Sequence, residues 1–194
     1  EGYILPLLSS VNGEKNTEYF LLEFIYTEER LNKPENFWHV WKLLYKTVTE
    51  RGVWYNGRVL GIYMLTDHMA LVEGKWHSFN KENTWLFDKL SIDCGREPIV
   101  MFSIAKSLNG LANDYIDQGI EWFYRIVHNY LAIELRDYQS NTIYYMEKLF
   151  SKYIRQNRMT IRSNNMKKQK IIDILSFMVE RESVQAYMLR EYLA

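Results

Sequence analysis

Single glycines interrupt this sequence at intervals of about 20 to 25 residues, at Gly52, Gly74, Gly95 and Gly119. Between them, apolar residues recur at steps of three and four, which brings their side chains to one face of a helix. No run of β-branched residues alternates with a period of two, as a half-buried strand would require. The sequence therefore predicts an all-α fold of amphipathic helices joined by short turns.

The clearest pattern lies in residues 98–119, where Pro98 suits a first helical turn and Gly119 is the expected end of one long helix. Short connections imply antiparallel neighbours. Antiparallel helix pairs of this length form an α-solenoid of HEAT, armadillo or TPR type, or alternatively an orthogonal helical bundle. The even spacing of the turns favours the solenoid, although no repeat of residue identity is visible. About nine helices are predicted in all, and the later ones cover residues 120–135, 140 onward, 167–180 and 184–193.

The length of 194 residues and a hydrophobic content of 47% suit a single α-helical repeat domain over residues 1–194. The chain begins at Glu1 rather than Met, and we expect it to be a segment of a larger protein. Its one cysteine, Cys94, excludes an intramolecular disulfide and a cysteine-based metal cluster, which favours a reducing, cytoplasmic location. No apolar run is long enough for a membrane span, so no membrane partner is expected.

The charge is unevenly distributed, although the formal net charge is zero. Residues 1–147 carry 14 basic and 20 acidic groups, whereas residues 148–170 carry eight basic groups and no acid. Four of these cations fall at offsets of 0, 4, 7 and 14, which places them on one side of a helix, with apolar residues on the other. The cations are Lys148, Lys152, Arg155 and Arg162, and the apolar residues are Leu149, Phe150, Tyr153 and Ile154.

Such a basic amphipathic helix suits an acidic protein partner, for which Arg155, Arg158 and Arg162 are the first expected contacts. The alternative is nucleic acid, with phosphates on the cations and bases stacked on nearby tyrosines. A third interpretation is a basic face that is simply solvated, or that meets the acidic face of residues 1–147 or of another domain. The tyrosines are Tyr144, Tyr145 and Tyr153. The predicted partner-binding residues are Lys148, Lys152, Arg155, Arg158, Arg162, Lys167 and Lys168.

A second candidate site is the segment from Asp67 through Glu73 to Lys75. Two carboxylates followed by a lysine resemble the magnesium line of a restriction-like nuclease. The pattern is short and lies in a segment with helical spacing, whereas that fold needs a sheet. The favoured interpretation is that the two acids are exposed on a helix that ends at Gly74, and the nuclease is the least favoured hypothesis.

No other motif indicates an enzyme. The glycines occur singly and form no phosphate-binding loop, and the histidines lack zinc-protease spacing, so neither a cofactor nor a metal is expected. The tryptophan spacing agrees with buried stripes, and any tryptophan that is exposed instead would anchor a protein interface. The histidines are His39, His68, His77 and His128, and the aromatic anchor candidates are Trp38, Trp41 and Trp122.

The closing segment, residues 171–194, resembles the helical-repeat carboxy-terminal regions of bacterial STAND-type NTPases, including antiviral sensors. The element FWHVWKLLY near Phe37 is similar to a Phe-Trp-x-x-Trp element of the same regions. The matching residues of the closing segment are Phe177, Val179, Glu180, Arg181, Ser183, Ala186, Tyr187, Leu189, Arg190 and Glu191.

In that family the nucleotide site and the effector lie in other domains, while the repeats recognise a ligand, often a phage protein. This chain lacks the family's phosphate loop, in agreement with its being a segment. The resemblance implies a non-enzymatic helical-repeat sensor that recognises a protein ligand in bacterial antiviral defence. In such a module we expect Tyr187 to pack the last helix and Arg190 to pair with nearby acids.

Overall fold

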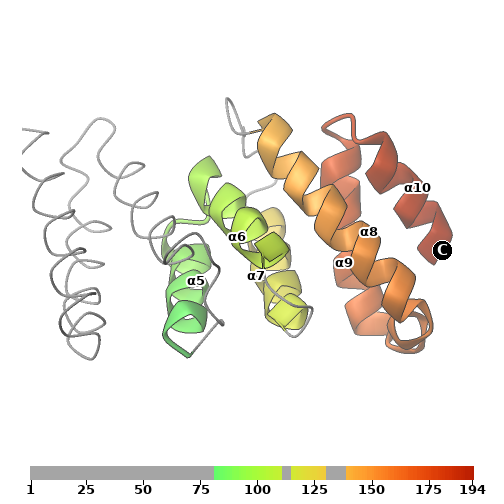
Figure 1. Cartoon of the computed structure of the whole chain (residues 1–194), viewed down its shortest axis with the longest axis horizontal. Coiled ribbons are helices and arrows are strands. Elements are labelled where there is room, and N and C mark those ends of the chain that lie inside the picture. The colour runs from blue at the N-terminus through green and yellow to red at the C-terminus, as the bar shows by residue number, and fades with distance from the viewer. Residues whose placement is uncertain (1–80, 111–114, 130–138) are drawn as a thin grey trace, which may run out of the picture. The chain divides into compact units, whose positions relative to one another are not determined.

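A computed structural model describes residues 81–110, 115–129 and 139–194. All of them fall within one compact unit that spans Met69–Ala194. Figure 1 shows the described helices, coloured by their position in the chain. The predicted helices before residue 81 lie outside the described residues, and the single-domain assignment for residues 1–194 stays a prediction. The described part of the chain is all-helical and contains no strand, as predicted. Its six helices are α5 (Lys81–Asp93), α6 (Pro98–Gly110), α7 (Ile116–Asn129), α8 (Gln139–Ser163), α9 (Asn165–Val179) and α10 (Val184–Leu193).

The predicted single helix over residues 98–119 is wrong. The helix opened by Pro98 ends at Gly110, after the helix-terminating pair Asn109-Gly110, and a new helix begins at Ile116. Gly119 lies inside α7 rather than at a helix end. A Cβ at Gly119 would collide with the side chain of Leu108, so the missing side chain lets α7 approach α6 closely.

The two turns that join the last three helices follow standard capping chemistry. Between α8 and α9, the side chain of Asn164 accepts a hydrogen bond from the backbone N–H of Lys167 at 3.0 Å. Between α9 and α10, Glu182 adopts a left-handed φ of 66°, and Ser183 Oγ accepts a hydrogen bond from the backbone N–H of Ala186 at 3.0 Å. The predicted helices over residues 167–180 and 184–193 are thereby confirmed to within two residues.

Each described helix packs against the next helix but one as well as against sequence neighbours. The pairs α5–α7 and α7–α9 form one series, and the pairs α6–α8 and α8–α10 form the other. Large buried side chains from α5 to α8 fill the core between them, and Phe123 of α7 meets Phe150 of α8 with ring centroids 5.9 Å apart. The largest fully buried side chains are Phe123, Phe150, Leu86, Leu90, Ile99, Met101 and Ile104.

Candidate functional site

The basic stretch over residues 148–170 covers most of α8, the turn at Asn164 and the start of α9. Four of its cations project from the side of α8 that faces away from the core, and we call them the α8 row: Lys148, Lys152, Arg155 and Arg162. The opposite side of the helix is buried, as the sequence predicted, through Leu149, Phe150, Tyr153 and Ile154.

The α8 row is exposed to solvent. Within the described part of the chain, no hydrogen bond or ion pair involves any of these four side chains. Neighbouring cations of one sign on a helix face repel one another, so such a row is not explained by the stability of α8. An acidic ligand would remove this repulsion, which makes the α8 row the candidate binding site.

A kink bends the α8 row between Arg155 and Arg162. Asn157 has non-helical backbone angles, φ −120° and ψ 17°, inside α8. Its side-chain amide donates to the carbonyl of Tyr153 at 3.0 Å and so occupies an acceptor of the helix. Lys148, Lys152 and Arg155 therefore share one straight segment, and Arg162 follows the bend.

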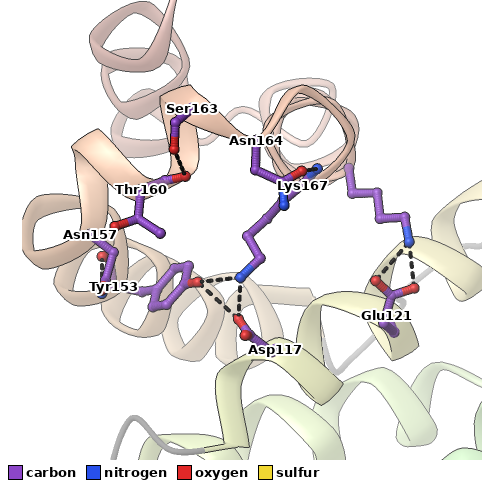
Figure 2. Close-up of polar contacts among 9 residues, drawn as sticks. Asp117, Glu121, Tyr153, Asn157, Thr160, Ser163, Asn164 and Lys167 are labelled. Atoms are coloured by element: carbon purple, nitrogen blue, oxygen red, sulfur yellow. Dashed lines mark hydrogen bonds and ion pairs between the residues drawn. The ribbon is translucent and has the colours of Figure 1, made fainter.

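Lys167 is held inside the fold rather than offered to a partner. Its ammonium group lies 2.9 Å from Asp117 Oδ1 on α7 and 3.4 Å from the hydroxyl oxygen of Tyr153 on α8. The Tyr153 hydroxyl in turn donates to Asp117 Oδ1 at 2.9 Å (Figure 2). Burial alone would raise the pKa of Asp117, but the hydrogen bonds from Lys167 and Tyr153 and the lysine charge together lower it. The three side chains join α7, α8 and α9.

A second ion pair lies one helical turn further along the same two helices. Lys170 Nζ is 2.6 Å from Glu121 Oε2 and 5.4 Å from the centroid of the Tyr124 ring. Asp117 and Glu121 are four residues apart on α7, so they face Lys167 and Lys170 across one interface. Part of the basic stretch is thus compensated by acids of α7, which lie 49 and 50 residues earlier in the chain.

The remaining predicted cations, Arg158 and Lys168, also have contacts within the fold. The guanidinium of Arg158 lies 4.0 Å from the centroid of the Tyr192 ring on α10. Lys168 Nζ lies 3.4 Å from the carbonyl oxygen of Ala194. Of the seven predicted partner-binding residues, the structure therefore leaves the four of the α8 row exposed together and places Arg158, Lys167 and Lys168 in contacts between helices.

Sequence reasoning missed an exposed apolar row on α10. Val184, Met188 and Tyr192 recur at steps of four and are 71%, 58% and 41% exposed. We call them the α10 row. Tyr187 is half exposed rather than packed as expected, whereas Arg190 does pair with an acid, Glu191, at 3.8 Å.

Only one of the three tyrosines considered for base stacking is open to solvent. Tyr144 is exposed at the start of α8. Tyr145 packs near Phe102, with ring centroids 6.0 Å apart, and Tyr153 is buried and hydrogen-bonded to Asp117. The geometry thus provides one exposed ring beside the α8 row rather than a series of stacking platforms.

The other residues singled out in the sequence have ordinary structural surroundings where they are described. Trp122 is a core residue that packs against Phe87, with ring centroids 5.6 Å apart. His128 stacks on Tyr124 at 5.4 Å, and Cys94 is fully buried. In the described ranges, no group of His, Cys, Asp and Glu side chains is arranged to hold a metal ion. The candidates outside the described residues are Trp38, Trp41, His39, Asp67, His68, Glu73, Lys75 and His77.

None of the helices in residues 81–110, 115–129 and 139–194 combines the length and the apolar character that crossing a membrane requires. Comparison of the sequence with protein-family models gave no match, and comparison with curated proteins gave no significant one.

Proposed function

We propose that this chain is a non-enzymatic, α-solenoid-like interaction module that binds an acidic protein ligand through the α8 row. The next-but-one helix contacts support the solenoid arrangement, because stacked helix pairs place every second helix in the same layer. The resemblance of residues 171–194 to the repeats of STAND-type NTPases supports a sensor role in bacterial antiviral defence, inside the cytoplasm.

The single observation that carries the proposal is the exposed, unpaired state of the α8 row within the described residues. Four positive charges on one face, with no acid between Lys148 and Lys170, create a positive potential that steers an acidic partner and orients it on contact. The two arginines add planar guanidinium groups that bind carboxylates through two parallel hydrogen bonds.

A protein ligand is favoured over nucleic acid by what lies beside the α8 row. Single strands are held by cations together with several aromatic rings on which bases stack. Beside the α8 row only Tyr144 of the three candidate tyrosines is exposed, while exposed Met159 lies between Arg155 and Arg162. Methionine is adaptable and common at protein-binding surfaces.

The test is a fluorescence-anisotropy titration with a labelled glutamate-rich peptide that contains no apolar residue, and with single- and double-stranded DNA and RNA. Each probe is titrated at low and at near-physiological salt against the chain and against the triple variant Lys152→Glu, Arg155→Glu, Arg162→Glu. The matched control is Lys89→Glu, a charge reversal at an exposed position of α5. Circular dichroism verifies that each variant is folded.

We expect the glutamate-rich peptide to bind the chain and the Lys89→Glu control, and to lose at least about tenfold in affinity with the triple variant. Tighter binding of an oligonucleotide, retained at near-physiological salt and lost in the triple variant, would replace the proposal with the nucleic-acid function. Equal binding of every probe to the chain and to the triple variant would show that the α8 row is only a solvated surface.

A further inference from the structure

Helices α8 and α10 lie side by side and run in the same direction (Figure 1). Three contacts in chain order define this arrangement. Ser183 donates to Glu147 at 2.6 Å, Gln185 donates to Ser151 at 3.0 Å, and Arg158 covers the ring of Tyr192 at 4.0 Å. The residue numbers increase together on both helices, so the two axes are parallel over this length.

The contact between Arg158 and Tyr192 brings the α8 row next to the α10 row. On α8, Arg155 lies three residues before Arg158, across the kink at Asn157, and Arg162 lies four residues after it. Met188 lies one turn before Tyr192 on α10. A line of exposed cations and a line of exposed apolar side chains therefore run alongside one another, and we call their combined surface the α8–α10 face.

We propose that the α8–α10 face binds an acidic amphipathic helix of a protein partner, with carboxylates against the α8 row and apolar side chains against the α10 row. This inference rests on the proposed function and adds the form of the ligand. The charge of the α8 row selects acids, and the α10 row supplies apolar area that a purely acidic ligand would leave exposed to water.

A helix fits this face better than an extended strand. A helix carries an acidic stripe and an apolar stripe side by side, because residues at steps of three and four form neighbouring rows along its surface. A strand offers one row on each of two opposite faces, so it cannot place both kinds of side chain on the same surface. Recognition of an amphipathic helix along an apolar surface is a recurrent mode of peptide binding.

The inference is tested with three labelled helical peptides of about 18 residues, long enough to span the α8 row at 1.5 Å per residue. In the amphipathic peptide, glutamates and leucines occupy adjacent stripes. The shuffled peptide has the same composition with both residue types distributed around the helix. The acidic-polar peptide keeps the glutamates in place and replaces each leucine with glutamine.

The peptides are titrated against the whole chain and against two double variants of the α8–α10 face. One is Lys152→Glu with Arg155→Glu in the α8 row, and the other is Val184→Gln with Met188→Gln in the α10 row. The matched controls lie on α5, where Lys89→Glu repeats the charge reversal and Ile92→Gln repeats the loss of an exposed apolar side chain. Val184, Met188 and Ile92 are all exposed, so these substitutions leave the core intact.

We expect the amphipathic peptide to bind the chain about tenfold more tightly than the other two peptides. The α10 variant should lose this tenfold preference while it retains binding of the acidic-polar peptide. The α8 variant should lose both, and the controls should lose neither. The acidic-polar peptide has no leucines and can bind only the α8 row. Its affinity therefore tests the proposed function, whereas the tenfold preference for the amphipathic peptide tests this inference.

Equal affinities for the three peptides, with no effect of the α10 variant, would overturn the inference and leave the proposed function standing. Absence of binding by all three peptides to the folded chain would overturn both. Tighter binding of an oligonucleotide that competes with the amphipathic peptide would also overturn both, in favour of nucleic acid.

Discussion

The ammonium group of Lys167 lies 2.9 Å from the carboxylate of Asp117, a residue 50 positions earlier in the chain. Asp117 also accepts a hydrogen bond from the hydroxyl of Tyr153, so one carboxylate joins three helices. This relationship separates Lys167 from the α8 row, because a cation that already has a partner within the fold contributes little to binding another molecule.

Replacement of Asp117 by Asn should lower the free energy of unfolding at neutral pH by about 0.5–1.5 kcal/mol, because it removes the lysine's ion pair and weakens the tyrosine's hydrogen bond. Urea titrations of the chain and the variant measure this difference. Glu182→Gln serves as the control, since it neutralises an exposed acid outside this cluster. A loss of stability equal in both variants would show that net charge, and not the contact, is responsible.

The same cluster should make stability depend on pH in two windows. The pKa of Asp117 is lowered in the folded chain from 3.8, so its contribution is present above that value and is lost as the pH falls through the lowered pKa. Burial would lower the pKa of Lys167, yet its contacts with Asp117 and Tyr153 raise it above 10.5. Burial and the bond to Asp117 raise the pKa of Tyr153 above 10.0.

For Lys167 and Tyr153 the contribution is therefore present below pH 10 and is lost as the pH rises through the raised values. Denaturation of the chain from acid to alkaline pH should show both losses. In Asp117→Asn, the free energy of unfolding should fall less steeply at acid pH, and its loss at alkaline pH should be smaller. An unchanged profile in the variant would contradict the role of the cluster.

Gly119→Ala should destabilise the chain by about 1–2 kcal/mol, even though alanine favours helices over glycine by up to 1 kcal/mol. The added Cβ would overlap with a terminal methyl group of Leu108, a buried side chain that would have to shift. Combining it with Leu108→Ala should cost less than the two single losses added together, because the shorter side chain removes the overlap. Higher stability of Gly119→Ala alone would show that the Leu108 side chain shifts at little cost.

Charge reversal should affect two neighbouring arginines of α8 differently. Arg155→Glu should change the free energy of unfolding by less than about 0.5 kcal/mol, since the side chain is exposed. Arg158→Glu should lower it by about 1–2 kcal/mol, since it removes the guanidinium from the Tyr192 ring and brings a carboxylate to that ring. Equal losses in urea titrations would contradict the division of the basic stretch into the α8 row and structural cations.

Ser183 has two separable roles at the start of α10. Its Oγ accepts from the backbone N–H of Ala186 and donates to Glu147. Ser183→Ala should remove both bonds and cost about 1–2 kcal/mol, measured by urea denaturation. Ser183→Asp keeps a capping oxygen but repels Glu147, so we expect Glu147→Gln to restore stability to the Asp variant and not to the Ala variant. Rescue of neither variant would show that the cap alone matters.

The sequence was sufficient for features that depend on local spacing. The buried side of α8 and the bounds of α10 follow from apolar steps of three and four and from polar caps such as Ser183. The sequence was insufficient where one helix carries two apolar rows, only one of which is buried. In α10 the buried residues Ala186, Leu189 and Leu193 and the exposed α10 row both recur at helical spacing, so the pattern alone does not decide which row is covered.

The other failures involve contacts between residues distant in the chain. The apolar stripe runs from Ile99 to Ile116 without showing the break after Gly110. Glycine is common at helix ends, so the sequence predicts one at Gly119. Only the position of Leu108 on α6 shows why a glycine is needed inside α7. The pairing of Lys167 and Lys170 with acids of α7 likewise depends on how α9 packs, which local spacing does not contain.

The succession of contacts between helices one or two places apart has a kinetic consequence. Among the described helices, the principal pairings join helices one or two places apart in the chain, so folding should be faster than in a fold whose first and last elements must pair. In such a chain, single helices can also unfold locally while the others remain folded. Hydrogen exchange should show the amides of α10 exchanging by local opening while those of α7 remain protected, which would let the α8–α10 face adjust to a ligand without unfolding the rest.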